Sequence, residues 1–276
     1  MFDVERTVND LISWLRSSVD LTQSVVIGIS GGKDSAIAAA VCAAAIGEDN
    51  VIGVIMPNGT QADIKDAYYI VNHLNIPHIT VDVSRSVTNI QSELIDYLDE
   101  LHIDRIPNKA KVKMTSHIRT DVLHMVADSI NAIVINPVTT TKTMVGACED
   151  TLIQNTLFPF INLSGFKVKE IGRYLSVPEF IINKPSRIDT CGESIELKLG
   201  FTLDEADKII DMGWVEINEL ADKDDVSDRN VMVMKKLIEI DHDRNKETVL
   251  DLISSMLLSC SFYPVDDDDE PIEFQW

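Results

Sequence analysis

The residues best suited to chemistry lie in one short loop, Ser30-Gly-Gly-Lys-Asp-Ser35. Paired glycines let a backbone turn sharply and bring its N–H groups close to a ligand. The first turn of a following helix adds N–H donors and the positive end of its dipole, and both serines add hydroxyl donors. This combination predicts a cradle for phosphate groups. A carboxylate at Asp34 would repel phosphate, so we expect a Mg²⁺ ion between the two.

Two common phosphate-binding loops do not fit this spacing. A Walker A loop needs Gly-x-x-x-x-Gly-Lys-Ser/Thr, but Gly32-Lys33 is followed by Asp34, and Ile27 occupies the first glycine position. A dinucleotide-binding Gly-x-Gly-x-x-Gly is also absent from the sequence. A simpler alternative stays open at this stage, in which the segment is a strand–helix turn whose Asp or Ser side chain only caps the helix.

Strands that alternate with helices are expected to position this loop. The run 24–29 is continuous and β-branched, which predicts a buried strand directly before the loop. Further strands are expected at 51–56, 79–83 and 132–135, and helices at 4–15, 36–46, 63–74, 87–101, 109–129, 167–175, 203–212, 231–240 and 247–259. The alternation predicts a doubly wound α/β fold with a mostly parallel sheet of about five strands and C-terminal helices.

The composition limits the choice of partners. The chain has 276 residues, with 24 basic and 45 acidic side chains and a net charge of −21. Such a surface should repel nucleic acid and anionic membranes, so a phosphate-rich ligand needs a focused site. Widely spaced cysteines, no apolar run of roughly 18 residues and no signal-peptide pattern predict a cytoplasmic protein without a membrane span. We expect one domain over residues 1–276, with residues 264–276 as an acidic tail.

The loop carries the signature Ser-Gly-Gly-x-Asp-Ser, and the chain resembles the ammonia-dependent NAD synthetases among the N-type ATP pyrophosphatases. Met56-Pro-Asn-Gly-Thr-Gln61 resembles the family segment after the second strand, and Ala110-Lys-Val-Lys-Met114 resembles its Ala-Arg-x-Arg-Met helix start. Glu179–Pro185 and Leu199–Glu205 resemble two later family segments. The resemblance spans roughly residues 4–244 and implies an adenine nucleotide α-hydrolase-like fold.

The resemblance also implies a reaction. The carboxylate of deamido-NAD attacks the α-phosphate of ATP, pyrophosphate leaves, and free ammonia then displaces AMP to give NAD. Mg²⁺ is the implied metal, held by Asp34, and a homodimer is the implied assembly. The implied nucleotide-binding residues are Gly28, Ser30, Gly31, Gly32, Asp34, Ser35, Met56, Thr60, Gln61, Lys111 and Lys113, and the implied catalytic residues are Asp34, Thr141 and Lys142.

Departures from the family gather on one side of the implied site. Ungapped alignment places Lys142 where the family has a metal-binding glutamate, and Gly165 stands where it has a lysine. The family's Tyr-Gly-Asp-Gly loop is missing between Gly146 and Phe158. Lys142 could therefore neutralise phosphate charge itself or turn away from the site. Two other functions stay open: an ATP pyrophosphatase acting on another acceptor, and a non-catalytic nucleotide-binding relative.

Overall fold

The structure, a computed structural model, describes residues 2–61, 63–100, 102, 105–145, 155–185, 196, 199–211, 230 and 232–235. Residues 232–235 are helical, in agreement with the helix expected at 231–240. The rest of that helix, the helix expected at 247–259 and the acidic tail lie outside the described residues.

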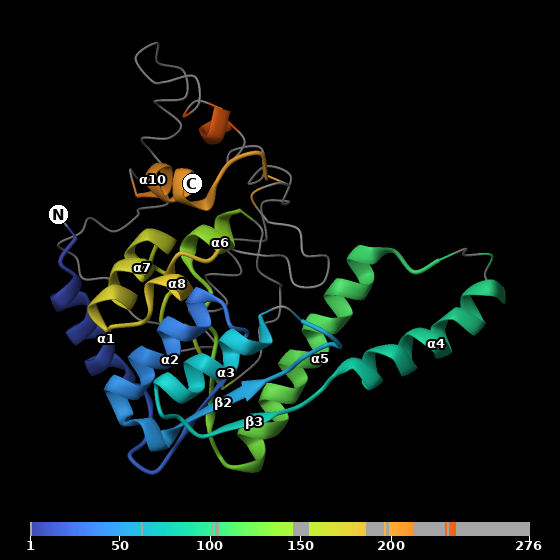
Figure 1. The fold of residues 1–276 in the computed structure, drawn as a ribbon, viewed down its shortest axis with the longest axis horizontal. Coiled ribbons are helices and arrows are strands. Elements are labelled where there is room, and N and C mark those ends of the chain that lie inside the picture. The colour runs from blue at the N-terminus through green and yellow to red at the C-terminus, as the bar shows by residue number, and fades with distance from the viewer. Residues whose placement is uncertain are drawn as a thin grey trace.

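Among the described residues, five strands form a parallel sheet at the centre of the fold (Figure 1). They are β1 (Val25–Gly28), β2 (Val51–Ile55), β3 (His78–Thr80), β4 (Ile133–Ile135) and β5 (Thr156–Leu157). Their order is β3-β2-β1-β4-β5, and each of the four pairings is parallel. The predicted parallel α/β sheet is confirmed.

Alternate residues of the central strands face two different apolar cores, because successive side chains of a strand point to opposite faces. Val25 and Ile27 lie in the larger core, whereas Val26 and Val54 lie in the smaller one. The larger core is covered by α1 (Val4–Ser18), α2 (Lys33–Ile46), α3 (Ile64–His73), α7 (Gly165–Tyr174) and α8 (Glu179–Ile182), and the smaller by α5 (Asn108–Ser129). Helices on both faces confirm the doubly wound arrangement.

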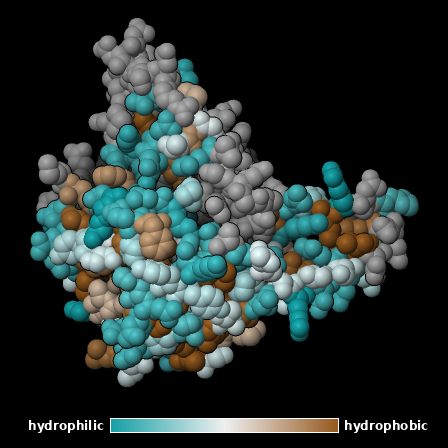
Figure 2. Space-filling view, in the orientation of Figure 1, coloured by the Kyte–Doolittle hydropathy of each residue, from teal (hydrophilic) through white to brown (hydrophobic). Residues whose placement is uncertain are grey.

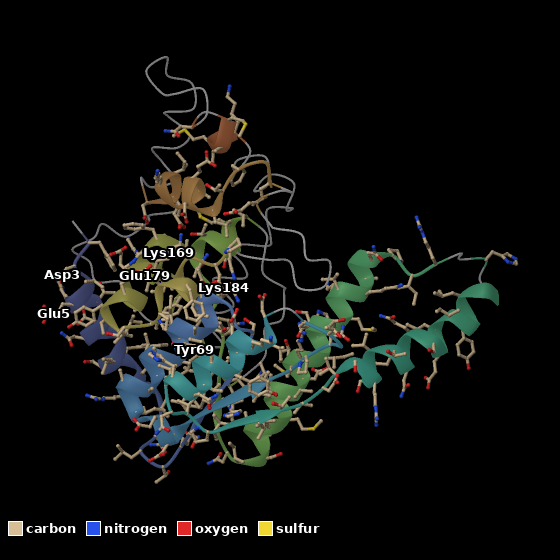
Figure 3. All side chains as sticks on the ribbon, viewed as in Figure 1. Asp3, Glu5, Tyr69, Lys169, Glu179 and Lys184 are labelled. Atoms are coloured by element: carbon tan, nitrogen blue, oxygen red, sulfur yellow. The ribbon has the colours of Figure 1, made fainter. Side chains whose placement is uncertain are left out.

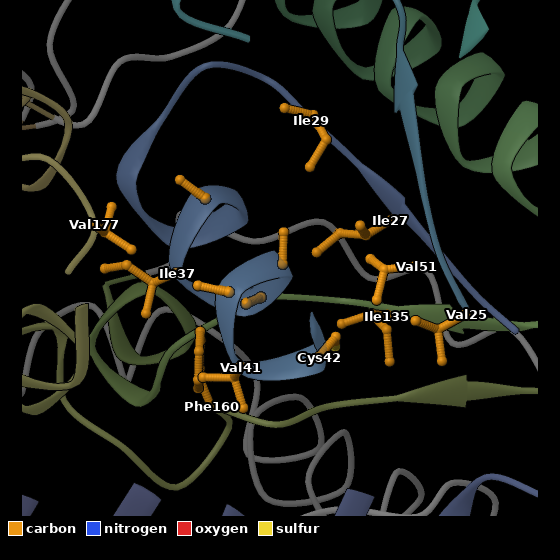
Figure 4. Packing of buried hydrophobic residues seen from close by; sticks show 14 of the residues in the cluster. Val25, Ile27, Ile29, Ile37, Val41, Cys42, Val51, Ile135, Phe160 and Val177 are labelled. Atoms are coloured by element: carbon orange, nitrogen blue, oxygen red, sulfur yellow. The ribbon is translucent and has the colours of Figure 1, made fainter. Parts of the chain in front are cut away.

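The helix α2 lies inside the larger core because its side chains are small. Its residues from Ala36 to Cys42 are all buried, and Figure 4 shows Ile37 and Val41 among strand residues and Phe160. Alanine combines a high helix propensity with a small volume, which permits close packing all round. A Cβ at Gly172 would lie 2.8 Å from the side chain of Ile37, so α7 also packs closely on α2. The helix that begins at the phosphate loop is therefore held firmly.

The remaining elements extend this core. The helix α4 (Ser84–Glu100) packs on α5, and both project from the sheet as an arm, defined here as residues 84–100 and the N-terminal half of α5 (Figure 1). A separate apolar cluster joins α10 (Leu203–Ile210) to the end of the short helix α6 (Thr140–Met144). A 3-10 turn, η1, spans Glu48–Asn50. None of the described helices is both long and apolar enough to cross a membrane.

Candidate active site

The strand order locates a ligand site. The chain runs from β1 outward through β2 to β3 and then returns to the other side of β1 as β4. In open α/β sheets, ligands bind beyond the carboxyl ends of the strands where the direction reverses in this way. The loop 30–35 follows β1, and the segment 136–142 follows β4. The two segments singled out by the sequence therefore meet at this switch point.

Hydrogen bonds give the loop its shape. The hydroxyls of Ser30 and Ser35 lie 3.1 Å apart, and the Ser35 hydroxyl donates to the carbonyl of Gly32 over 3.1 Å. Gly32 N donates to Ser30 Oγ over 3.3 Å. At Gly31 the backbone has a φ of +76°, and a Cβ there would lie only 2.4 Å from the carbonyl oxygen of Asp63. Glycine is therefore required at this position.

The N-terminus of α2 lies within the motif. The helix begins at Lys33, and its N-cap residue is Gly32, which leaves the first turn without a side-chain cap. No Asp or Ser side chain of the loop therefore serves as the N-cap of α2. Because the first N–H groups of a helix have no acceptor within it, this turn suits an anion.

Lys142 points into the site. Its Nζ lies 2.6 Å from Oδ2 of Asp34, and only 7% of the Asp34 side chain is exposed. The other carboxylate oxygen, Asp34 Oδ1, is buried and has no hydrogen-bond partner among the described residues. Lys142 therefore does not turn away from the loop, and its ammonium neutralises the charge of Asp34. Its contact with phosphate stays a prediction.

A small pocket adjoins this ion pair. It is lined by Lys33, Asp34, Thr139, Thr141, Lys142, Gly165, Leu203 and Asp207. Lys33 is buried, and this burial lowers the pKa of its ammonium, against the opposing effect of Asp34. Lys142 lowers the pKa of Lys33 further, because a second positive charge nearby disfavours ionisation. An anionic group close to these two ammonium ions would relieve that repulsion.

Thr141 is held by a contact that its sequence position did not reveal. Its hydroxyl donates to Oδ1 of Asp207 and accepts from Gly165 N over 3.1 Å. Gly165 N also donates to Oδ1 of Asp207 over 2.9 Å. A Cβ at Gly165 would lie 2.9 Å from Oδ2 of the same carboxylate. A larger residue at position 165 would therefore displace Asp207.

Asp207 belongs to a row of aspartates on one face of α10. Asp204 pairs with Lys169, and Asp211 accepts from Ser164 Oγ over 3.0 Å. Positions 204, 207 and 211 share a helix face because they are three and four residues apart. All three face the N-terminal part of α7, where a helix dipole favours negative charge. This row fastens α10 beside the pocket.

The other expected nucleotide-binding residues lie at different depths. Gly28 and Met56 are neighbours, since a Cβ at Gly28 would lie 3.3 Å from Met56 Cε. After β2, Thr60 is exposed and Gln61 is half-buried. Lys111 and Lys113 lie in the first turns of α5, on the arm, and no described hydrogen bond or ion pair joins them to loop 30–35. These assignments stay predictions.

Sequence reasoning missed two residues that the fold brings to the site. Asp207 lies two residues beyond the segment Leu199–Glu205 that resembles the family, and Lys184 lies within the resembling segment Glu179–Pro185 without a role assigned to it. Lys184 Nζ donates to the carbonyl of Gly31 over 2.8 Å. Within the described part of the chain, no cluster of three or more His, Cys, Asp or Glu side chains could hold a metal ion.

Comparisons with known proteins agree on one family. The model of the NAD synthase family matches residues 7–247. The NH(3)-dependent NAD(+) synthetase of Methanococcus aeolicus is 30% identical over 231 residues, which cover 81% of this chain and 87% of the relative. An NMN synthetase structure from Francisella tularensis has a TM-score of 0.72 at 24% identity and covers 88% of this chain and 96% of its own. An NH3-dependent NAD synthetase structure from Campylobacter jejuni has a TM-score of 0.67 at 18% identity, with 90% and 96% covered.

Asp207 predicts a specific pH dependence of stability. Burial raises its pKa to about 6, although the hydrogen bonds from Thr141 and Gly165 lower it. The Asp207 carboxyl group therefore binds its proton more tightly in the folded state than in the unfolded chain. Above pH 6 the carboxylate is charged and lowers the free energy of unfolding. That cost decreases as the pH falls from about 6 towards about 4. From pH 7 to pH 5, the wild type should gain about 1 kcal/mol of unfolding free energy relative to Asp207→Asn, measured by urea unfolding.

The exposed Asp49 offers a matched control, since Asp49→Asn removes one carboxylate without removing a buried one. An equal stability difference between wild type and Asp207→Asn at both pH values would contradict the prediction.

Proposed function

The chain belongs to the NAD synthase family, and from this premise we propose that it is an ammonia-dependent NAD synthetase. It would convert deamido-NAD and ammonia to NAD with ATP, releasing AMP and pyrophosphate. The observation that carries the proposal is the loop 30–35 at the switch point of the sheet, paired with Lys142 from α6, which follows the neighbouring strand β4. The cytoplasmic location expected from the sequence is part of the proposal.

The phosphate loop supplies most contacts to the leaving group in this proposal. The hydroxyls of Ser30 and Ser35 and the first-turn N–H groups of α2 hold the pyrophosphate portion of ATP. Lys33 and Lys142 neutralise the charge that develops on pyrophosphate as it leaves. Gly28, Met56, Thr60 and Gln61 contact the nucleoside.

Magnesium fits this site as an ion that arrives with the phosphates. Mg²⁺ in nucleotide sites is commonly held by one or two carboxylates together with phosphate oxygens. Asp34 Oδ1 is a buried acceptor with no described partner, whereas Oδ2 is taken by Lys142. Asp34 would therefore hold the ion through Oδ1, and the bound ion would supply further charge neutralisation to the phosphates.

The chemistry needs little covalent help from the protein. Once the carboxylate of deamido-NAD has attacked the α-phosphate, the adenylate must be kept from water until ammonia arrives. Positioning and exclusion of water are the contributions required of the site. The pocket beside Lys142 and Thr141 adjoins the phosphate loop and is closed on one side by α10, through Leu203 and Asp207.

We also propose a homodimer formed through the arm. The helix α4 exposes Ile90, Leu94, Ile95 and Tyr97. Figure 2 shows apolar side chains gathered on the arm. A second copy of the chain would cover this apolar surface and bring the lysines at the start of α5 near a bound nucleotide. Isologous contacts of this kind are the commonest route to a dimer.

The reaction itself is the first test. Purified protein with ATP, Mg²⁺, deamido-NAD and ammonium chloride should form NAD, AMP and pyrophosphate in equal amounts, measured by chromatography. Gly31→Ala should abolish product, because its Cβ would overlap the Asp63 carbonyl. Gly47→Ala is the matched control, since Gly47 also has a positive φ but only one atom near its Cβ position, at 4.0 Å.

Other outcomes separate the alternative functions. The likeness to an NMN synthetase suggests nicotinic acid mononucleotide as a second acceptor to test. Pyrophosphate release only with that acceptor would assign a different substrate. No release with either acceptor, together with retained ATP binding, would assign a non-catalytic nucleotide-binding protein.

Lys142 should govern the magnesium requirement. Lys142→Met removes the ammonium beside Asp34, so affinity for metal-free ATP should fall about tenfold or more, as expected for loss of one charged contact. Lys142→Glu should lower the Mg²⁺ concentration needed for half-maximal ATP binding, because a second carboxylate beside Asp34 is itself a magnesium ligand. Isothermal calorimetry with and without EDTA measures both effects.

Lys167→Met provides the control for these variants. Lys167 pairs with Asp211 at 3.6 Å and has a similar side-chain exposure, but it lies outside the pocket lining. If neither Lys142 variant changes ATP affinity or its dependence on Mg²⁺, then Lys142 does not act on the phosphates.

The dimer has a direct mass test. Light scattering at micromolar concentration should give twice the chain mass for the wild type. Replacing both Leu94 and Tyr97 by Lys should give a monomer, since charged side chains would be buried without partners. Leu21→Lys changes a fully exposed leucine outside the arm and should stay dimeric. A monomeric wild type would refute this assembly.

A further inference from the structure

Lys184 joins the phosphate loop to two carboxylates. It follows α8, and its Nζ donates to Gly31 O over 2.8 Å, to Asp63 Oδ1 over 3.1 Å and to Asp66 Oδ2. Only 18% of the side chain is exposed. Figure 3 shows Lys184 where α8 approaches the first turns of α2 and α3. A single ammonium group thus uses its three donors on partners from two segments of the chain.

The hydrogen bond from Lys184 to the Gly31 carbonyl sets the direction of a neighbouring N–H group that can donate to phosphate. In a trans peptide, the C=O and the following N–H lie in one plane and point in opposite directions. When Lys184 holds the carbonyl of Gly31, the N–H of Gly32 must point the other way. That N–H donates to Ser30 Oγ over 3.3 Å, so it faces the interior of the loop.

The two aspartates hold the ammonium in place. Asp63 and Asp66 lie at the start of α3, directly against Gly31, whose Cβ position would be 2.4 Å from Asp63 O and 3.3 Å from Asp66 Cβ. Each carboxylate forms an ion pair with Lys184. Two anchored carboxylates limit the positions that Nζ can take, which fixes its bond to the loop.

We propose that Lys184 is a positioning residue for the leaving pyrophosphate: it orients the Gly31–Gly32 peptide so that Gly32 N–H faces the phosphates. This inference rests on the proposed function only in assigning phosphate to loop 30–35. Lys184 itself does not touch the ligand and acts through the backbone.

Other contacts hold α8 on α3 without Lys184. The rings of Tyr69 and Phe180 pack edge to face with centroids 5.1 Å apart, and His73 lies 3.3 Å from the carbonyl of Ser176. Ile181 and Ile182 are completely buried. Removal of the Lys184 ammonium should therefore disturb the loop and leave the fold intact.

Lys184→Met tests the inference by calorimetry with Mg-ATP and, separately, with inorganic pyrophosphate. We expect affinity for both to fall at least tenfold, with a rise in KM for ATP and little change in KM for ammonia. Lys167→Met is again the control, because Lys167 also pairs with an aspartate, Asp211, but no described hydrogen bond or ion pair joins it to loop 30–35. Unchanged affinity of Lys184→Met for both ligands would overturn the inference.

A double substitution separates orientation from simple charge. A rival explanation is that Lys184→Met weakens binding only because the unpaired Asp63 and Asp66 then repel phosphate. In that case, replacing both aspartates by Asn in the Lys184→Met variant should restore affinity. Full recovery overturns the orienting role, and a persistent loss supports it. If Lys184→Met does not fold, Lys184→Arg keeps the charge but moves the donors, and it should bind Mg-ATP more weakly; wild-type affinity would again overturn the inference.

Binding of Mg-ATP and pyrophosphate to the wild type distinguishes failure of the proposed function from failure of the role proposed for Lys184. If the wild type binds neither Mg-ATP nor pyrophosphate, the proposed function fails, and with it the ligand on which Lys184 is said to act. If the wild type binds both and Lys184→Met binds them equally well, only the role of Lys184 fails.

Discussion

The site depends on the ion pair between Lys142 and the buried carboxylate of Asp34. A carboxylate buried at the start of α2 is costly unless a positive charge accompanies it, and removing either partner would leave the other uncompensated. The pair joins α6 to α2, and therefore the segment after β4 to the loop after β1. Because β1 and β4 are hydrogen-bonded neighbours, the spacing between adjacent strands sets how closely these segments approach. Sheet geometry and site electrostatics thus support each other.

The strong negative charge of the chain makes this local arrangement necessary. With a net charge of −21, the protein surface as a whole does not attract a triphosphate. Three lysines, Lys33, Lys142 and Lys184, lie at the switch point, and the last two are already paired with aspartates. Those pairs hold the ammonium groups in defined positions before a ligand arrives, which reduces the ordering cost of binding.

The sequence predicted the strands and the loop well because their signals are local. The β-branched run at 24–29 and the Ser-Gly-Gly-Lys-Asp-Ser string each depend on adjacent residues. The start of α2 was placed at Ala36, three residues late, because Lys33, Asp34 and Ser35 are polar and hide the apolar pattern. The elements α6, α8 and β5 have two to five residues, which is too short for a periodic signal. Lys184 and Asp207 reach the site through contacts between distant segments, and no spacing within one segment could reveal them.

The spread of these contacts along the chain also bears on synthesis. Gly31 meets Lys184 across 153 positions, and Thr141 meets Asp207 across 66. A nascent chain that has emerged only as far as β4 contains the complete phosphate motif but neither Lys184 nor Asp207. Such a chain lacks two contacts that shape the proposed site, so nucleotide would stabilise most strongly a protein whose C-terminal segments have already docked. Ligand binding would thereby report on completed biosynthesis rather than on folding of the N-terminal half alone.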